Sequence, residues 1–364
     1  MGFPGCRQSL GLGRNMATVA LVVLLLIQLP AGDSAQEAKG GKKKEAGGKG
    51  GKGGKVGGAS QKLKRLSEEG FAAAEAGNLD LCSRKFAAAA KLDPTYSDYH
   101  TQLATCLRGL GRKQEAMQEF ELARLHMDEQ RNRAGGDMYW ASVHINLGYL
   151  YAEGGGAGSV EGGMAKAAQA FAKATELAPQ LADAYSYLGN ALSELGDFEK
   201  ARNVYQKAID KVVPKSQADK QSMLYFHLAG AHGNLGDTDK ALKAYKASTK
   251  ANPKFAASYT NMGTIYQGRK QNEKARDVLE IAVQLDGQLA EAYTNLGVAL
   301  QDVGDKKRAV VMTRTAIELK PTLSPAQNNY GRALENDDQL ENALSAYYKA
   351  IQLSGESYSD AFCA

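Results

Sequence analysis

The feature that most limits how this chain can fold is a pattern that recurs along it at a fixed spacing. Four segments align without gaps, at residues 182–189, 256–263, 290–297 and 324–331. Each segment ends in Gly at its eighth position, and the last three of these glycines stand 34 residues apart. A fixed period of this length indicates a stack of repeated units rather than one core built from distant segments.

The pattern continues beyond the glycine and beyond these four segments. Twelve residues after each Gly stands a small residue, at Ala201, Ala275, Ala309 and Ala343. Less complete copies extend the series to eight units over residues 63–357, with predicted starts at 63, 97, 141, 182, 222, 256, 290 and 324. Three spacings exceed 34, and we expect the extra residues in loops or at helix ends, including a loop within 153–163.

Each unit is predicted to be a pair of helices. Two stretches of about 13 residues have apolar side chains at helical spacing, and a turn containing Gly separates them, as at 195–197 and 303–305. Five prolines follow the second stretch, where Pro stops a helix: Pro94, Pro179, Pro214, Pro253 and Pro321. The small residue at position eight is expected to let the two helices approach closely.

These residues resemble the tetratricopeptide repeat, whose pattern is aromatic-x2-Leu-Gly-x2-Tyr, then Ala-x3-Phe, then Pro. The resemblance covers residues 63–357. It implies an all-α fold, an α-solenoid in which about eight helix-turn-helix units form a right-handed superhelix. Residues 358–364 are predicted to be a tail or the start of an incomplete ninth unit, because 357–362 echoes 95–100.

The first 35 residues are predicted to be a secretory signal. Residues 17–29 form an uncharged apolar run after Arg7 and Arg14, and small residues follow it. The run is shorter than the roughly 20 residues of a membrane span, so we expect cleavage after Ser34. The protein would then be secreted or lumenal. An uncleaved segment that anchors the protein in a membrane is the alternative.

Residues 36–62 are rich in Lys and Gly and are predicted to be a disordered linker, because such a composition cannot offset its ordering entropy. Residues 1–60 carry nine basic and three acidic side chains, and the whole chain carries +5, so the rest carries −1. This balance argues against a specific nucleic-acid-binding body. A solubilising tether is the favoured interpretation of the linker, with attachment to an anionic lipid or another acidic surface as the alternative.

No catalytic or metal-binding arrangement is found in the sequence. His100 and His144 stand at the aromatic position four of their units, which predicts a packing role. The glycine-rich stretch 154–163 lacks the Gly-Lys-Ser/Thr ending of a phosphate-binding loop. Cys82 and Cys106 are expected to be two buried thiols, although a secretory protein would allow them to pair. We therefore predict no enzyme activity, no metal and no cofactor.

The resemblance implies a binding surface on the concave face, where first helices contribute positions 2, 5, 6 and 9. Carried over residue by residue, the predicted peptide-binding residues are Asn146, Tyr149, Asn190, His227, Thr260, Asn261, Thr264, Thr294, Asn295, Asn328, Asn329 and Arg332. An Asn amide offers both an acceptor and donors, which match a peptide backbone. The strip resembles the asparagine ladder of O-linked N-acetylglucosamine transferases.

Two classes of function follow. The first is a non-catalytic scaffold that binds an extended peptide or partner segment in the groove. The second is the substrate-recruiting region of a glycosyltransferase-type enzyme whose catalytic part is missing here or lies on another chain. The carboxylate clamp of chaperone cofactors is not expected, because Asn190 is accompanied by Ser186 and His227. No polar capping helix follows residue 355, so a truncated end, a partner or a second copy is expected at the C-terminal face.

Overall fold

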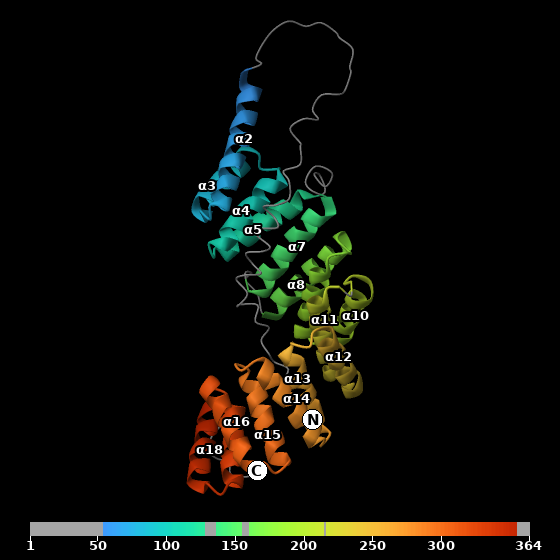
Figure 1. The fold of residues 1–364 in the computed structure, drawn as a ribbon. Coiled ribbons are helices and arrows are strands. Elements are labelled where there is room, and N and C mark those ends of the chain that lie inside the picture. Colours follow the sequence, from blue (N-terminus) through green and yellow to red (C-terminus); the bar gives the residue numbers. More distant parts are fainter. Residues whose placement is uncertain (1–53, 128–135, 155–159, 215, 355–364) are drawn as a thin grey trace. The chain divides into compact units, whose positions relative to one another are not determined.

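The computed structural model describes residues 54–127, 136–154, 160–214 and 216–354, and in these residues every regular element is an α-helix (Figure 1). The helices are α2 Gly54–Glu75, α3 Leu79–Leu92, α4 Ser97–Gly109, α5 Lys113–Leu125, α7 Gly136–Ala152, α8 Val160–Leu177, α9 Ala182–Glu194, α10 Phe198–Lys211, α11 Ala218–Asn234, α12 Thr238–Ala251, α13 Ala256–Gly268, α14 Asn272–Leu285, α15 Ala290–Asp302, α16 Lys306–Leu319, α17 Ser324–Asn336 and α18 Leu340–Ser354. They follow one another as helix pairs, which confirms the predicted all-α solenoid. The predicted signal and the tail lie outside the described residues.

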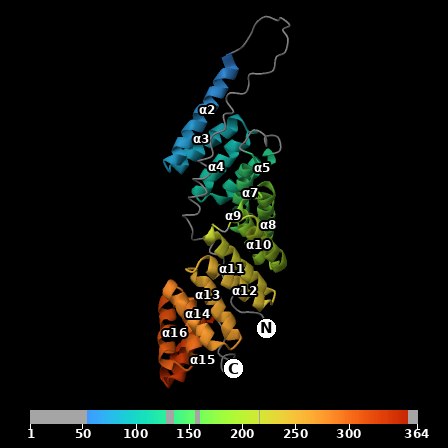
Figure 2. The same ribbon diagram turned by 45° about the vertical axis from the view of Figure 1, so that its right-hand side comes forward.

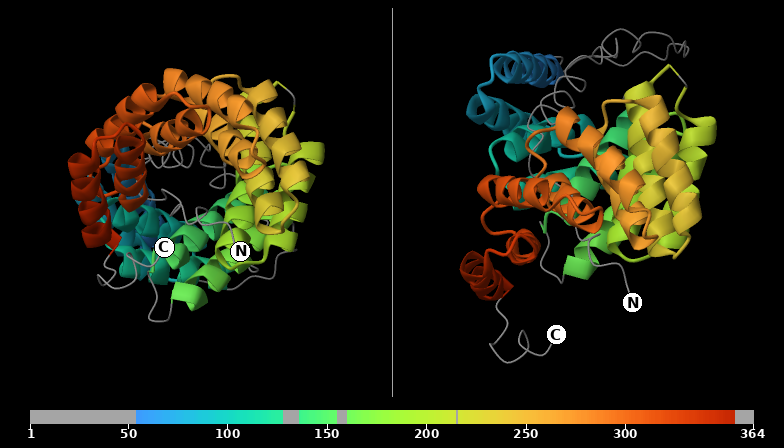
Figure 3. Two further views of the ribbon diagram at one scale, coloured as in Figure 1. Left: turned by 90° about the horizontal axis from the view of Figure 1, so that it is seen from below. Right: turned by 60° about the horizontal axis from the view of Figure 1, so that its bottom comes forward.

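The chain divides into two units, residues 1–204 and 205–364. In the second unit each helix packs against the next one in the chain, from α11 to α18. The first helices of neighbouring pairs also contact each other, α13 with α15 and α15 with α17. Figures 2 and 3 show these yellow-to-red helices as consecutive stacked pairs. The first helices therefore lie side by side and share one face.

Five of the eight predicted repeat starts are confirmed by the structure. Helices α4, α9, α13, α15 and α17 begin at residues 97, 182, 256, 290 and 324. The other first helices begin earlier than predicted, with α2 at Gly54, α7 at Gly136 and α11 at Ala218. Part of the inserted sequence thus lengthens helices instead of forming loops. Residues 54–62 are accordingly helical rather than part of a disordered linker, and α8 begins inside the predicted loop 153–163.

The turn within each pair requires a left-handed backbone. Gly residues supply it in six pairs, with φ between 73° and 87°, because Gly adopts this conformation without a Cβ clash. They are Gly77, Gly111, Gly154, Gly196, Gly236 and Gly304. In the other two pairs Lys270 and Asp338 take the same place, with φ of 55° and 59°. The left-handed conformation of the turn is therefore kept even in the two pairs that have another residue in place of Gly.

The glycine at position eight makes room for a large side chain of the second helix. A Cβ on Gly263 would lie 2.5 Å from Leu279 Cγ, and one on Gly331 would lie 2.7 Å from Tyr347 Cδ1. The same relation joins Gly148 to Phe171. Real Cβ atoms do not make such contacts, so the side chain of the second helix fills the space directly above the glycine backbone. This packing sets how closely the paired helices approach.

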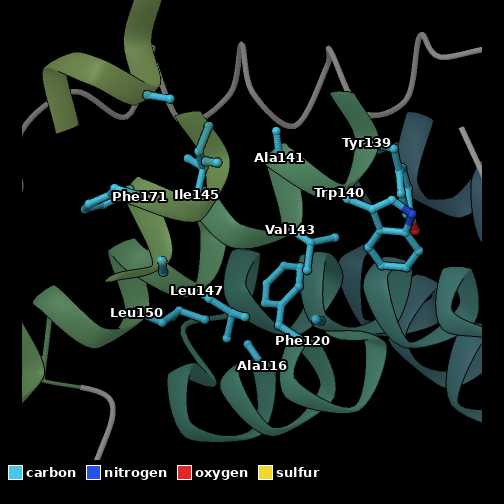
Figure 4. Close-up of a cluster of buried hydrophobic side chains, with 14 of the residues drawn as sticks. Ala116, Phe120, Tyr139, Trp140, Ala141, Val143, Ile145, Leu147, Leu150 and Phe171 are labelled. Carbon is cyan, nitrogen blue, oxygen red and sulfur yellow. The ribbon is translucent and has the colours of Figure 1, made fainter. Parts of the chain in front are cut away.

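Neighbouring pairs share a continuous core. In the first unit, Phe120 of α5 lies next to Val143 and Leu147 of α7, and all three are essentially inaccessible to solvent (Figure 4). Burial of a side chain such as Phe contributes roughly 1.5–3 kcal/mol relative to exposure. Because Phe120 belongs to one pair and Val143 to the next, a pair gains this energy only by stacking.

Cys82 and Cys106 form a disulfide between α3 and α4, with their Cα atoms 6.1 Å apart. The prediction of two buried thiols is therefore wrong, although both residues are buried as expected. The sequence places Cys82 in one pair and Cys106 in the next. It does not reveal that these two positions face each other when the pairs stack.

Gly263→Ala is expected to lower the free energy of unfolding by about 1–3 kcal/mol, because the new methyl group must displace the Leu279 side chain. Urea unfolding followed by circular dichroism measures the change. The matched control is Gly230→Ala in α11, where an added Cβ meets no atom within 4 Å and helix propensity should add up to about 1 kcal/mol. Equal stability of the two variants would contradict this packing.

Candidate functional site

Two of the predicted asparagines in the second unit use their amides inside the stack. The Asn261 Nδ2 donates to the Tyr245 hydroxyl at 3.1 Å. The Asn295 Nδ2 donates to Thr264 Oγ1 at 3.1 Å, which joins α15 to α13. These bonds fix the orientation of both amides. They leave the carbonyl oxygen of each side chain as an acceptor for other groups.

Two glutamines that sequence reasoning missed reinforce this stacking. The Gln267 Nε2 donates to the main-chain oxygen of Asn295 at 2.9 Å, and the Gln301 Nε2 donates to that of Asn329 at 3.2 Å. The two contacts are the same contact one repeat apart. A signal was present in the sequence, because Gln recurs at 267 and 301 with the repeat spacing. The amides of this face therefore hold neighbouring pairs together.

Three predicted binding residues are buried. Thr260 and Thr294 donate their hydroxyls to the carbonyl oxygens of Ala256 and Ala290, one helical turn earlier. Asn146 is 2% exposed. These three side chains are enclosed by neighbouring helices and cannot contact a ligand, whereas Asn328, at the same position as Thr260 and Thr294, is exposed. Thr264, Asn328 and Arg332 are exposed, while Tyr149, Asn190, His227, Asn261, Asn295 and Asn329 are half-buried.

His227 packs as an aromatic ring. Its ring stacks on Tyr205 with 5.6 Å between centroids and an interplanar angle of 16°, and Phe226 meets its edge. Burial lowers the pKa of His227 to about 4. The ring is therefore neutral at physiological pH. In the described ranges no three His, Cys, Asp or Glu side chains gather as a metal site, and no helix there is long and apolar enough to span a bilayer.

In the first unit four side chains from four helices meet. The guanidinium of Arg108 in α4 lies 5.6 Å from the ring centre of Tyr149 in α7. The Tyr149 ring lies 4.9 Å from Tyr187 in α9, and Phe171 in α8 lies 5.6 Å from Tyr187. We call Arg108, Tyr149, Phe171 and Tyr187 the tyrosine–arginine cluster. Helix stacking brings it together, since no two members share a helix.

A small, mostly apolar pocket opens at this cluster. Its lining residues are Tyr149, Ala152, Met164, Phe171, Tyr187, Asn190, Ala191 and Glu194. Tyr149 and Asn190 belong to the predicted set, so the structure brings two of those residues to one pocket. The rings form the apolar wall, and the side chains of Asn190 and Glu194 are its polar groups.

Hydrogen bonding orients the guanidinium of Arg108. Its Nη1 donates to Asn146 Oδ1, while Asn146 Nδ2 donates to the Ser142 carbonyl oxygen at 3.0 Å. Buried Asn146 thus supports Arg108 instead of contacting a ligand itself. Burial lowers the pKa of Arg108 and raises the pKa of Tyr149 and of Tyr187. Both phenols are therefore neutral, and no carboxylate among the described residues forms an ion pair with Arg108.

Arg108 was missed because it stands at position twelve of its unit, outside the positions carried over from the resemblance. The signal in the sequence was that Arg108 is the one Lys or Arg of its first helix. The charge of Glu153 acts to raise the pKa of Arg108, but the Glu153 carboxylate is paired with Lys113, with 2.9 Å between Oε2 and Nζ. The remaining N–H groups of the guanidinium have no hydrogen-bond acceptor among the described residues.

Comparison with known families and structures agrees with this architecture. Residues 180–254, 227–290, 290–323 and 324–357 match models described as "Tetratricopeptide repeat". Residues 180–357 are tetratricopeptide repeats. The helices before residue 180 follow one another as packed pairs in the same way. No curated protein sequence gives a significant match.

Solved structures with similar folds are helical repeat proteins. The structure titled "Crystal structure of APC/C hetero-tetramer Cut9-Hcn1" has 15% identity and a TM-score of 0.51, covering 78% of this chain and 52% of that one. YrrB, described as a TPR protein with an unusual peptide-binding site, has 24% identity, a TM-score of 0.43 and coverages of 54% and 97%. MamA from Desulfovibrio magneticus RS-1 has 21% identity, a TM-score of 0.42 and coverages of 49% and 97%. At these identities the likeness concerns the fold alone.

The two histidines at position four are buried, as expected for packing residues. The His100 Nδ1 lies 2.6 Å from Glu119 Oε2, and its Nε2 lies 2.9 Å from the Pro94 carbonyl oxygen. The His144 Nε2 has no hydrogen-bond partner among the described residues. Burial, with Arg124 and Lys173 adding to it, lowers the pKa of His144 to about 4. Burial also lowers the pKa of His100, but its bonds to Glu119 and Pro94 outweigh this and raise it overall.

The stability of the protein should therefore fall on acidification through His144. At pH values between the unfolded pKa of about 6.5 and the folded pKa, only the unfolded chain binds the proton. Each pH unit in this range lowers the free energy of unfolding by about 1.4 kcal/mol. The contribution of neutral His144 to the free energy of unfolding is fully present above pH ~6.5. It is lost as the pH falls towards ~4, by up to roughly 3 kcal/mol. His144→Phe should flatten this slope in urea unfolding at several pH values. His100→Gln should act oppositely, with its largest loss at low pH; an unchanged slope in His144→Phe contradicts the assignment.

Proposed function

We propose that this protein is a non-catalytic interaction scaffold that binds an extended peptide or partner segment along the face of its first helices. The observation that carries the proposal is the tyrosine–arginine cluster with its pocket. Tyr and Arg dominate the energetics of protein interfaces because they offer large contact areas together with polar groups. A cluster of this composition, assembled from four helices at a partly open pocket, fits an anchoring role.

In this proposal the ligand places an apolar side chain against the rings of Tyr149, Phe171 and Tyr187. The free N–H groups of Arg108 donate to a carbonyl or carboxylate oxygen beside that side chain. The amide of Asn190 provides a further contact for the ligand backbone. Apolar burial supplies most of the affinity, and the polar groups fix the direction of the chain.

The second unit offers a polar surface of its own, with less dependence on ligand sequence. The side-chain oxygens of Asn261 and Asn295 remain acceptors after their amide nitrogens have bonded within the stack. Asn328, Asn329, Arg332 and Thr264 add exposed or half-buried polar groups on first helices. Such groups match the donors and acceptors of any extended backbone, and His227 contributes an aromatic surface.

The alternative is the substrate-recruiting region of a glycosyltransferase-type enzyme. The recurring asparagines at 261, 295 and 329 favour it, because they echo the ladder of O-linked N-acetylglucosamine transferases. Both functions use the same face to hold a polypeptide. They differ in the fate of the bound chain, since only the alternative predicts that a captured polypeptide becomes glycosylated when a catalytic chain is added.

We also propose that the protein acts in the secretory pathway, lumenal or secreted, with membrane anchoring as the alternative. The Cys82–Cys106 disulfide supports this, because disulfides persist in oxidising compartments. N-terminal sequencing of the exported chain decides between cleavage after Ser34 and a retained anchor. Contact of the Lys-rich segment with anionic lipid belongs to the same proposal.

Tyr187→Ala is expected to weaken peptide binding at least tenfold, or about 1.4 kcal/mol, because it removes one wall of the pocket. The probe is a phage-displayed library of random peptides selected on the full chain, with affinities then measured by calorimetry. Selected peptides should share an apolar residue, and Arg108→Gln should weaken them as well.

Tyr293→Ala is the matched control, because Tyr293 is also half-buried on a first helix but lies outside the cluster. Its peptide affinities should equal those of the unaltered chain. Selection that yields no peptide, or peptides that bind Tyr187→Ala and the unaltered chain equally, would overturn the proposal.

A further inference from the structure

Helix α18 exposes a stripe of large apolar side chains. Leu340, Leu344 and Tyr348 are 66%, 59% and 45% exposed. Residues four apart in a helix lie above one another, so these three form one continuous row. Single exposed apolar residues are normal on a protein surface, but an aligned row marks a surface that contacts something. We call these residues the α18 stripe.

The α18 stripe occupies the side through which an earlier second helix forms an ion pair with the next second helix. Glu280 of α14 stands two periods before Tyr348, and its Oε1 accepts a hydrogen bond from Arg308 Nη2 of α16 at 2.7 Å. In α14, therefore, the position equivalent to Tyr348 faces the second helix of the following pair. By the same register the α18 stripe lies on the side that points towards the place of a following second helix.

The side chains at the stripe positions are mostly polar in the earlier second helices and become apolar in α18. The residues equivalent to the α18 stripe are Asn272, Arg276 and Glu280 in α14, and Lys306, Val310 and Arg314 in α16. Five of these six are polar or charged, whereas all three stripe residues are apolar or aromatic. The side of α18 is thus suited to a drier contact than those between successive pairs, closer in composition to the centre of a subunit interface.

A second row beside the stripe has a symmetric charge pattern. Glu341, Ser345 and Lys349 follow one another at intervals of four, and with Leu344, Tyr348 and Gln352 they line a shallow surface groove. Glu341 and Lys349 are equally far from Ser345, which is small enough to allow close approach. If a second α18 runs antiparallel across Ser345, each Glu341 lies opposite the Lys349 of the other helix. The row is therefore complementary to itself.

We propose that α18 is the contact surface for a second copy of this chain, joined by an antiparallel α18–α18 pair with its two-fold axis at Ser345. Such a contact is isologous and closes at two copies. The α18 stripe supplies its apolar centre, and two Glu341–Lys349 ion pairs at its edge set direction and register. The proposal is independent of the tyrosine–arginine cluster and its pocket, which lie in the other unit.

The mass of the full chain in solution, measured by sedimentation equilibrium over a range of concentrations, tests the proposal. The unaltered chain should be a dimer, and Leu344→Glu should be monomeric because it places charges at the apolar centre. Leu125→Glu on α5 is the matched control, because Leu125 is 69% exposed but lies elsewhere. It should dimerise normally, and circular dichroism should show that both variants are folded.

Charge exchange tests the antiparallel geometry. Glu341→Lys alone and Lys349→Glu alone should each raise the dimer dissociation constant at least tenfold, since each places like charges opposite one another. The double variant should restore the original value, because both pairs re-form with reversed sign. A parallel pair does not place these residues opposite each other, so it predicts no rescue.

Three results would overturn the proposal: a monomeric unaltered chain, association that persists in Leu344→Glu, or a double variant no tighter than the single ones. Deletion of residues 355–364 provides a further test. The dimer should survive this deletion; a chain that dimerises only after it would show that its own tail covers the α18 stripe. A larger complex formed only with another protein would assign the stripe to that partner instead.

Discussion

The close approach of two helices over a missing side chain is the interaction on which the rest of this structure depends. At Gly148, Gly263 and Gly331 a large side chain of the second helix occupies the space that a Cβ would need. This contact sets the spacing of each pair, and a left-handed residue in the turn lets the chain reverse within a few residues. Pairs built in this way leave apolar faces that only a neighbouring pair can bury.

Stacking, in turn, assembles the candidate site. No member of the tyrosine–arginine cluster shares a helix with another, so the cluster exists only when three consecutive pairs are in place. The asparagines of the second unit are subject to the same requirement, because Asn295 and Gln267 bind across the junction between α13 and α15. Within the second unit, the residues that hold pairs together and the residues proposed to meet a ligand therefore lie on the same first helices.

The sequence predicted the fold well because the pattern and the packing have the same cause. Five first helices begin at the predicted residues, whereas α2, α7 and α11 extend beyond the motif, which marks only the packed part of a helix. The site was predicted less well. A position number gives direction around a helix but not burial, so Thr260 and Thr294 were included. Arg108 was left out because position twelve was not among the positions considered. The Cys82–Cys106 bond was missed because it depends on contact between two pairs.

Removal of one period, residues 290–323, tests the central claim most directly. Because Ala290 and Ser324 occupy equivalent positions, the deletion joins two pairs in register and should leave a folded, helical chain with a cooperative urea transition. Deletion of 290–305 alone removes half a pair and should disrupt the stack that follows. A chain that unfolds after loss of the whole period, or tolerates both deletions equally, would contradict a structure built from stacked, interchangeable helix pairs.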